Sequence, residues 1–132
     1  MPVAEANKLA ASDEILMRQG HPNMMQEGRL WSGAFTPTKV DNGLLSADRD
    51  SVISPKDAYE RYLKLKALTQ AGGSWGVSVN EFKAIDLVCY ADPIADNAAH
   101  VLVDYAAKGA DKEKGLGKLA YAKASARGRL YP

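Results

Sequence analysis

Residues 54–68 have the sequence SPKDAYERYLKLKAL, which is the clearest local signal in the chain. Ser54 is a good N-cap residue, Pro55 suits the first helical position, and Asp57 favours the first turn of a helix. Apolar side chains then recur at helical spacing, at Ala58, Tyr62, Leu65 and Leu68. The pattern predicts a helix over residues 55–69.

Short apolar runs before and after this helix predict strands. Residues 75–79, WGVSV, alternate with period two, as a half-buried strand requires. Further strands are predicted at residues 30–35, 44–46, 87–90 and 100–105. Between the strands of the second half, residues 80–85 predict a short helical turn.

The C-terminal part of the chain predicts a second helix over residues 111–127. Its apolar stripe consists of Leu116, Leu119, Ala120 and Ala124. Gly115 and Gly117 weaken the helix, and Gly128 stands where a C-terminal cap belongs. Because strands and helices do not alternate strictly, a doubly wound parallel sheet does not fit. We therefore predict an α+β fold, with a small, mostly antiparallel sheet, one central helix and a C-terminal helix.

Length and composition indicate one globular domain. The chain has 132 residues, of which 46% are hydrophobic and 25% are charged. Residues 1–12 are expected to be a loosely attached N-terminal segment. We find no secretory leader pattern, and no apolar run approaches the ~20 residues that cross a bilayer. We expect a cytoplasmic protein that does not contact a membrane.

The charges give no strong electrostatic preference. There are 17 basic and 16 acidic residues, a net charge of +1, which argues against nucleic acid as a partner. From Lys112 onward six basic residues face only Glu113, and we interpret them as a solvated helix face. The single cysteine, Cys89, lies in an apolar run, which predicts a small buried residue rather than a nucleophile.

The sequence motifs of common catalytic machinery are absent. We find no phosphate loop of the GxxxxGK type, no GxGxxG, no GxSxG and no HExxH. One cysteine and two histidines make no recognisable zinc site. The sequence therefore predicts neither a cofactor nor a metal, and it leaves open whether the chain is an enzyme.

Polar residues near the predicted strands are the candidate site residues. His21, His100 and Glu81 would supply acid–base catalysis if they meet. The candidate ligand-binding residues are Arg29, Ser32, Ser46 and Arg49. A guanidinium fork suits a phosphate or carboxylate. The structural alternatives are surface or sheet-edge histidines, an Arg–carboxylate pair that joins two loops, and a glutamate that stabilises a helix start.

Several of these residues belong to a recognisable pattern. His21-Pro22, Gly28-Arg29-x-x-Ser32-x-Ala34-Phe35, Leu45-Ser46, Asp92-Pro93 and Ala99-His100 together resemble a group of small bacterial proteins of uncharacterised function. The resemblance covers most of the chain from about residue 15, implies a bacterial or phage origin, and carries no activity with it.

A second pattern resembles ADP-ribosyltransferase-type folds. In that likeness Arg18 or His21 would stand on a first strand, Leu45-Ser46 on a strand before a helix, and Glu81 at the position of a later glutamate.

Two functional hypotheses follow. The first is a protein-binding protein of the immunity-protein, antitoxin or inhibitor type, without catalytic activity. Its candidate anchors are Trp31, Trp75 and Tyr131, for which core packing is the alternative. The second is a small enzyme or ligand-binding domain that acts on a nucleotide-like anion. It requires one concave site formed by Arg29, Arg49, His21, His100 and Glu81.

Overall fold

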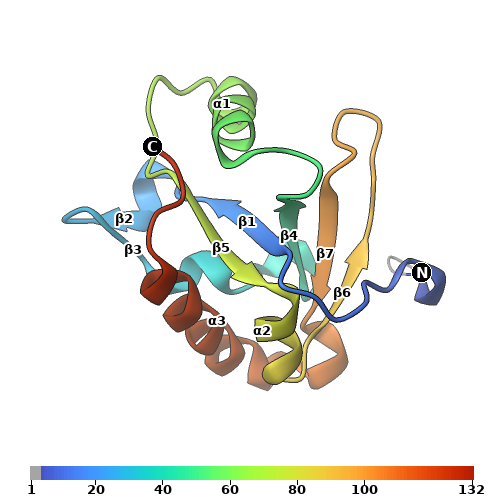
Figure 1. The fold of residues 1–132 in the computed structure, drawn as a ribbon. Helices are drawn as coiled ribbons and strands as arrows, with labels where there is room; N and C mark the ends of the chain where they lie inside the picture. The colour runs from blue at the N-terminus through green and yellow to red at the C-terminus, as the bar shows by residue number, and fades with distance from the viewer. Residues whose placement is uncertain (1–3) are drawn as a thin grey trace.

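Five strands form one sheet in which every neighbouring pair is antiparallel. The computed structural model describes residues 4–132, and its strand order is β5-β1-β4-β7-β6 (Figure 1). The strands are β1 (Ile15–Gln19), β4 (Leu44–Arg49), β5 (Ser74–Ser78), β6 (Val88–Ala91) and β7 (His100–Asp104). The predicted α+β class and antiparallel sheet are confirmed. The predicted strands at 44–46, 75–79, 87–90 and 100–105 are all present, with shifted ends.

Helix α1 (Pro55–Lys66) begins as the sequence predicts. The Ser54 hydroxyl accepts a hydrogen bond from the Asp57 backbone N–H at 3.1 Å, and Pro55 occupies the first turn. The helix ends three residues earlier than residue 69, because Ala67 adopts a left-handed conformation with φ of 55°. The chain therefore leaves the helix before it reaches the glycine pair at 72–73.

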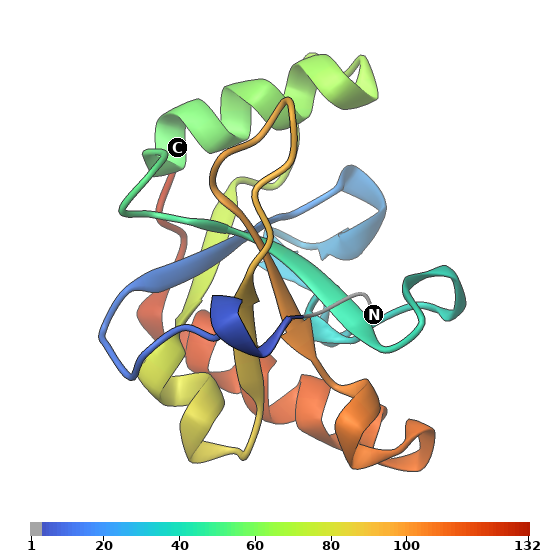
Figure 2. The ribbon, with the colours of Figure 1, turned by 90° about the vertical axis from the view of Figure 1, so that its right-hand side faces the viewer.

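Two further helices complete the architecture. Helix α2 (Val79–Ala84) is the predicted short turn, and α3 (Glu113–Arg127) is the predicted C-terminal helix, with Gly128 at its end. Helices α1 and α3 lie on opposite sides of the sheet in both views (Figures 1 and 2). The buried face of α3 consists of Gly117, Ala120 and Ala124. Leu119, predicted to belong to this face, is 52% exposed.

The predicted strand at 30–35 is wrong. Strands β2 (Met25–Gln26) and β3 (Arg29–Leu30) form a small two-stranded sheet, and a 3₁₀ turn, η3 (Ser32–Phe35), follows them. Ala34 and Phe35 are consecutive and both buried, whereas successive strand residues point to opposite faces. The tight turn brings both side chains into the core, and the Tyr105 hydroxyl donates to Phe35 O at 2.5 Å.

The core lies mainly between the sheet and α3. Its largest completely enclosed side chains include Tyr105, Phe35, Phe82, Leu16 and Leu45. Cys89 is also buried, and burial raises the pKa of its thiol to about 12. The thiol is therefore protonated at neutral pH, as expected of a packing residue and not of a nucleophile.

The described part of the N-terminal segment contacts the edge of the sheet. The Leu9 N–H donates to Cys89 O at 2.9 Å, and Lys8 forms an antiparallel bridge with Tyr90 of β6. Figure 2 shows this segment passing beside β6. Within residues 4–132, no helix is long and apolar enough to span a bilayer.

Candidate functional site

A polar groove lies over the sheet between α1 and the loop that joins β6 to β7. In both views this loop rises from the sheet on the same side as α1 (Figures 1 and 2). The groove has a volume of about 410 Å³, and its floor comes from β1, β4 and β7. The polar residues that line it and that matter below are Arg18, Ser46, Asp48, Arg61, Lys66 and His100.

Arg18 lies where β1 and β4 separate. These strands pair only at Leu16–Arg49 and Met17–Asp48. Just beyond the last pair, Arg18 Nη1 donates to Ser46 O at 2.7 Å, and its Nε donates to Ala34 O at 2.5 Å. The two bonds fix the guanidinium between β4 and η3, at the wall of the groove.

The charge of Arg18 has no carboxylate within ion-pair distance anywhere in residues 4–132. Burial lowers the pKa of the guanidinium from its ordinary value, and the more distant Asp41 carboxylate opposes that effect. Arginine nevertheless keeps its proton in proteins. A largely buried positive charge therefore lies beside the groove with carboxylates only beyond ion-pair distance, and such a charge is costly to desolvate.

Helix α1 adds two more cations to the groove. Arg61 and Lys66 project from the helix that Ser54 starts, with Tyr62 beside them. Burial raises the pKa of Tyr62, although the charge of Arg18 acts in the opposite sense, so the phenol stays protonated at neutral pH. Three cations and only one carboxylate, Asp48, therefore line the groove.

The opposite side of the groove carries hydrogen-bond acceptors. His100 Nδ1 lies 2.9 Å from Asp92 Oδ2 and 3.1 Å from Asp92 O. Both partners are oxygens, so Nδ1 carries a proton and, in the neutral ring, Nε2 is an acceptor. Asp48 lies directly opposite His100 in the β4–β7 pairing, and its Oδ1 accepts from Asn97 Nδ2 at 2.6 Å.

The residues predicted from the sequence do not form one site. Ser46 and His100 line the groove, whereas Arg29 and Ser32 line a separate hollow beside β3, and Glu81 lines a third. The His21 ring lies in a loop, where Nδ1 accepts from the Asn23 N–H at 3.0 Å. The required single concave site of arginines, histidines and Glu81 is therefore not present.

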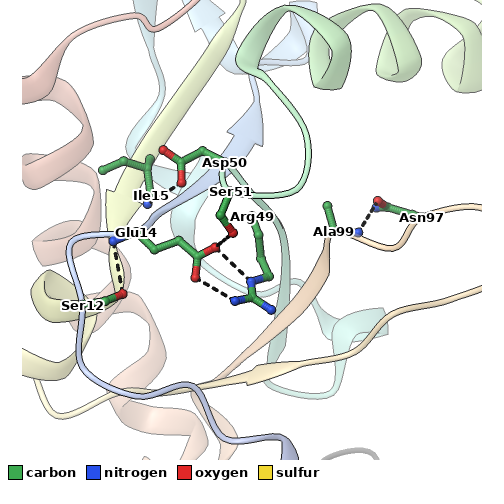
Figure 3. Close-up of polar contacts among 8 residues, drawn as sticks. All are labelled: Ser12, Glu14, Ile15, Arg49, Asp50, Ser51, Asn97 and Ala99. Carbon is green, nitrogen blue, oxygen red and sulfur yellow. Dashed lines mark hydrogen bonds and ion pairs between the residues drawn. The ribbon is translucent and has the colours of Figure 1, made fainter.

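Arg49 forms the Arg–carboxylate pair that the structural alternative describes, but with a distant partner. Its Nε and Nη2 donate to the two oxygens of Glu14 at 3.0 and 3.1 Å, and Ser51 also donates to Glu14 (Figure 3). Asp50 Oδ1 accepts from the Ile15 N–H at 3.0 Å. The cluster ties the start of β1 to the end of β4, so Arg49 is engaged in holding the sheet.

Glu81 stabilises the start of α2. It forms a capping box with Ser78, and Arg127 Nη1 donates to its Oε1 at 2.7 Å and to Gly76 O at 2.9 Å. Burial would raise the pKa of Glu81, but the Arg127 and Ser78 hydrogen bonds outweigh it and lower the pKa. In the ADP-ribosyltransferase likeness, Arg18 and Ser46 do contact each other, whereas Glu81 does not line their groove.

The three candidate partner-binding aromatics differ in exposure. Trp31 is 58% exposed, whereas Trp75 is 7% exposed, with its Nε1 donating to Gly72 O and Arg129 over its ring. Tyr131 is half-buried and packs edge-on against Tyr59, with the two ring centroids 5.6 Å apart. Trp75 is thus a core residue and is unavailable to a partner, which corrects its candidacy.

Comparison with protein-family models, with curated proteins and with solved structures gives no match to this chain. In the part of the chain that the structure describes, no three His, Cys, Asp or Glu side chains are grouped to hold a metal ion.

Proposed function

We propose that this protein binds a small anionic ligand, bearing a phosphate or carboxylate group, in the groove between α1 and the sheet. The observation that carries the proposal is Arg18. Arg18 lines the groove, its guanidinium is fixed by two carbonyl oxygens, and no carboxylate within residues 4–132 forms an ion pair with it. An anionic ligand would supply the missing counter-charge.

The surroundings of Arg18 suit such a ligand. Arginine binds carboxylates and phosphates through charge-assisted hydrogen bonds, which are stronger than neutral ones. Arg61 and Lys66 add positive charge from α1, and the volume of about 410 Å³ falls in the usual range for small-molecule sites. This proposal keeps the ligand-binding hypothesis but moves the site from Arg29 and Arg49 to the groove.

Inorganic phosphate tests the proposal directly. We expect the wild-type protein to bind phosphate in a calorimetric titration at low salt, and the double variant Arg61→Ala/Lys66→Ala to bind it about tenfold or more weakly. That change corresponds to about 1.4 kcal/mol, a modest share of two charge-assisted contacts.

The matched control is Lys114→Ala/Lys118→Ala, which removes the same charge from exposed positions of α3. It should bind phosphate like the wild type. If the wild type does not bind, or if both double variants lose the same affinity, the groove is not the anion site.

A specific observation also favours a second candidate function, the binding of a protein partner of the immunity-protein, antitoxin or inhibitor type. Trp31 is 58% exposed and lines a hollow with Arg29, Ser32 and Tyr121. Its indole lies against Gly33, where a Cβ would overlap the ring, so the glycine allows the ring to lie over the backbone. Exposed tryptophan beside arginine is typical of the residues that dominate interface energies.

For this candidate we expect Trp31→Ala to lose a stoichiometric partner that tagged wild-type protein captures from its host, as read by mass spectrometry. The melting temperature should stay unchanged, since the indole is mostly in solvent. Val40→Ala, at a position 86% exposed, is the control and should retain the partner. Equal recovery with both variants would exclude Trp31 as the anchor.

A further inference from the structure

We propose that the ligand of the groove is a phosphorylated sugar, with its phosphate on the α1 side and its hydroxyls on the β4–β7 side. This inference rests on the proposed anion-binding function and specifies the ligand class. It follows from how the charged and polar groups are distributed across the groove.

The cations and the acceptors lie on opposite sides. Helix α1 packs against β1 and β5, so Arg61 and Lys66 stand over that half of the sheet. The Arg18 guanidinium bonds to Ser46 O of β4, the middle strand. Asp48 and His100 lie on β4 and β7, farther along the strand order. A ligand that fills the groove therefore meets positive charge at one end and acceptors at the other.

The acceptor side requires hydrogen-bond donors from the ligand. Asn97 donates to Asp48 Oδ1, and no donor within residues 4–132 reaches Oδ2. The bonds from His100 Nδ1 to Asp92 leave Nε2 of the neutral ring as a second acceptor. Hydroxyl groups satisfy both positions, whereas a second anionic group would be repelled by the Asp48 carboxylate.

The remaining chemistry favours a polyol over an amine. An ammonium group would pair with Asp48 but would lie in the field of three cations, whereas a neutral hydroxyl carries no such penalty. Ile94, which is 49% exposed, lines the groove and gives it an apolar surface for the C–H face of a sugar. One anionic head and several hydroxyls on a compact carbon frame describe a sugar phosphate.

Ribose 5-phosphate, inorganic phosphate and ribose are the probes that test this inference, each titrated calorimetrically into the wild-type protein. We expect ribose 5-phosphate to bind about fivefold to a hundredfold more tightly than phosphate, because its hydroxyls add two hydrogen bonds. Ribose alone should bind far more weakly than either anion.

Two variants test which side chains make ribose 5-phosphate bind more tightly than phosphate. Asp48→Asn should reduce the ratio of ribose 5-phosphate to phosphate affinity about fivefold to tenfold, because an amide N–H₂ donor replaces the free acceptor Oδ2. The loss of its negative charge acts on both anions alike, so the ratio reports the contact with the hydroxyl. His100→Asn retains an N–H donor toward Asp92 and removes Nε2, and it should also reduce the ratio. Unchanged melting temperatures would show that both variants fold.

The failures of the two proposals are distinguishable. If phosphate binds through Arg61 and Lys66 but ribose 5-phosphate binds no more tightly, the sugar inference is wrong and the anion site stands. The inference is also wrong if the affinity ratio is unchanged in both Asp48→Asn and His100→Asn. If neither anion binds, both proposals are wrong.

Discussion

Alanine at Gly117 should lower the free energy of unfolding by about 1–3 kcal/mol, the usual cost of overpacking a close contact. Gly117 is buried in α3 against Thr36, directly after η3. A Cβ there would overlap Thr36 Oγ1 and lie 3.1 Å from Thr36 Cα, so backbone as well as side chain must move. Gly117, whose low helix propensity weakens α3, thus permits the close contact between α3 and Thr36.

Gly115 gives a matched control in the same helix. A Cβ at Gly115 would meet nothing within 4 Å, so Gly115→Ala should stabilise the protein by up to about 1 kcal/mol through helix propensity alone. Urea unfolding followed by circular dichroism measures both variants. Shifts of the same sign would mean that the contact between α3 and Thr36 does not determine the effect.

The contact matters beyond stability because η3 connects the core to the groove. Ala34 O accepts from Arg18, Phe35 O accepts from the buried Tyr105 hydroxyl, and the next residue, Thr36, packs on Gly117. The position of α3 therefore affects where η3 lies, and η3 in turn helps to hold the guanidinium of Arg18, a residue that lines the groove. The helix that packs under the sheet thus supports the site above it.

The local sequence predicts the helices and strands that carry a capping residue, a helix-ending residue or a regular spacing of apolar side chains. Helix α1 follows from Ser54 and Pro55, and β5 follows from its alternation. Strand β1 was not predicted, although it lies between β5 and β4, because Leu16 and Met17 are both buried on opposite faces and show no alternation. A strand covered on both sides resembles any short apolar run.

The candidate site is less predictable, because it depends on pairings across the sheet. Arg49 appears beside Asp48 and Asp50 in the sequence, but adjacent strand residues point to opposite faces, and its partner is Glu14, 35 residues away. Ser46 and His100 could be identified as polar residues on strands. Arg61 and Lys66 look like any solvated helix face until α1 is placed over β1.

Glutamine at Glu14 should lower the free energy of unfolding at pH 7 by about 2 kcal/mol, since it removes a charge-assisted, two-point pair with Arg49. The side chains are only 13% and 29% exposed, for Glu14 and Arg49 respectively, so solvent screens the pair weakly. Burial would raise the pKa of Glu14, but the hydrogen bonds from Arg49 and Ser51 and the Arg49 charge outweigh it, and the pKa is lowered.

The lowered pKa fixes the direction of the pH dependence. A carboxyl whose pKa is lower in the folded state contributes its full stabilisation above its ordinary value of 4.5, and loses it as the pH falls through the folded-state pKa. Wild-type stability should therefore fall below about pH 4.5, and Glu14→Gln should fall less steeply there, so that the two curves converge in acid. Glu81, whose pKa is lowered by Arg127 and Ser78, maintains part of the slope in the variant.

Chemical denaturation at a series of pH values from 7 to 3 measures this convergence. Glu60→Gln is the control, because Glu60 is exposed on α1 and forms no ion pair within residues 4–132. It removes the same charge and should leave both the stability at pH 7 and the acid slope close to wild type. A constant difference between wild type and Glu14→Gln at every pH would mean that packing, and not the charge of Glu14, joins β1 to β4. Convergence would show that the ion pair between Glu14 and Arg49 joins the start of β1 to the end of β4.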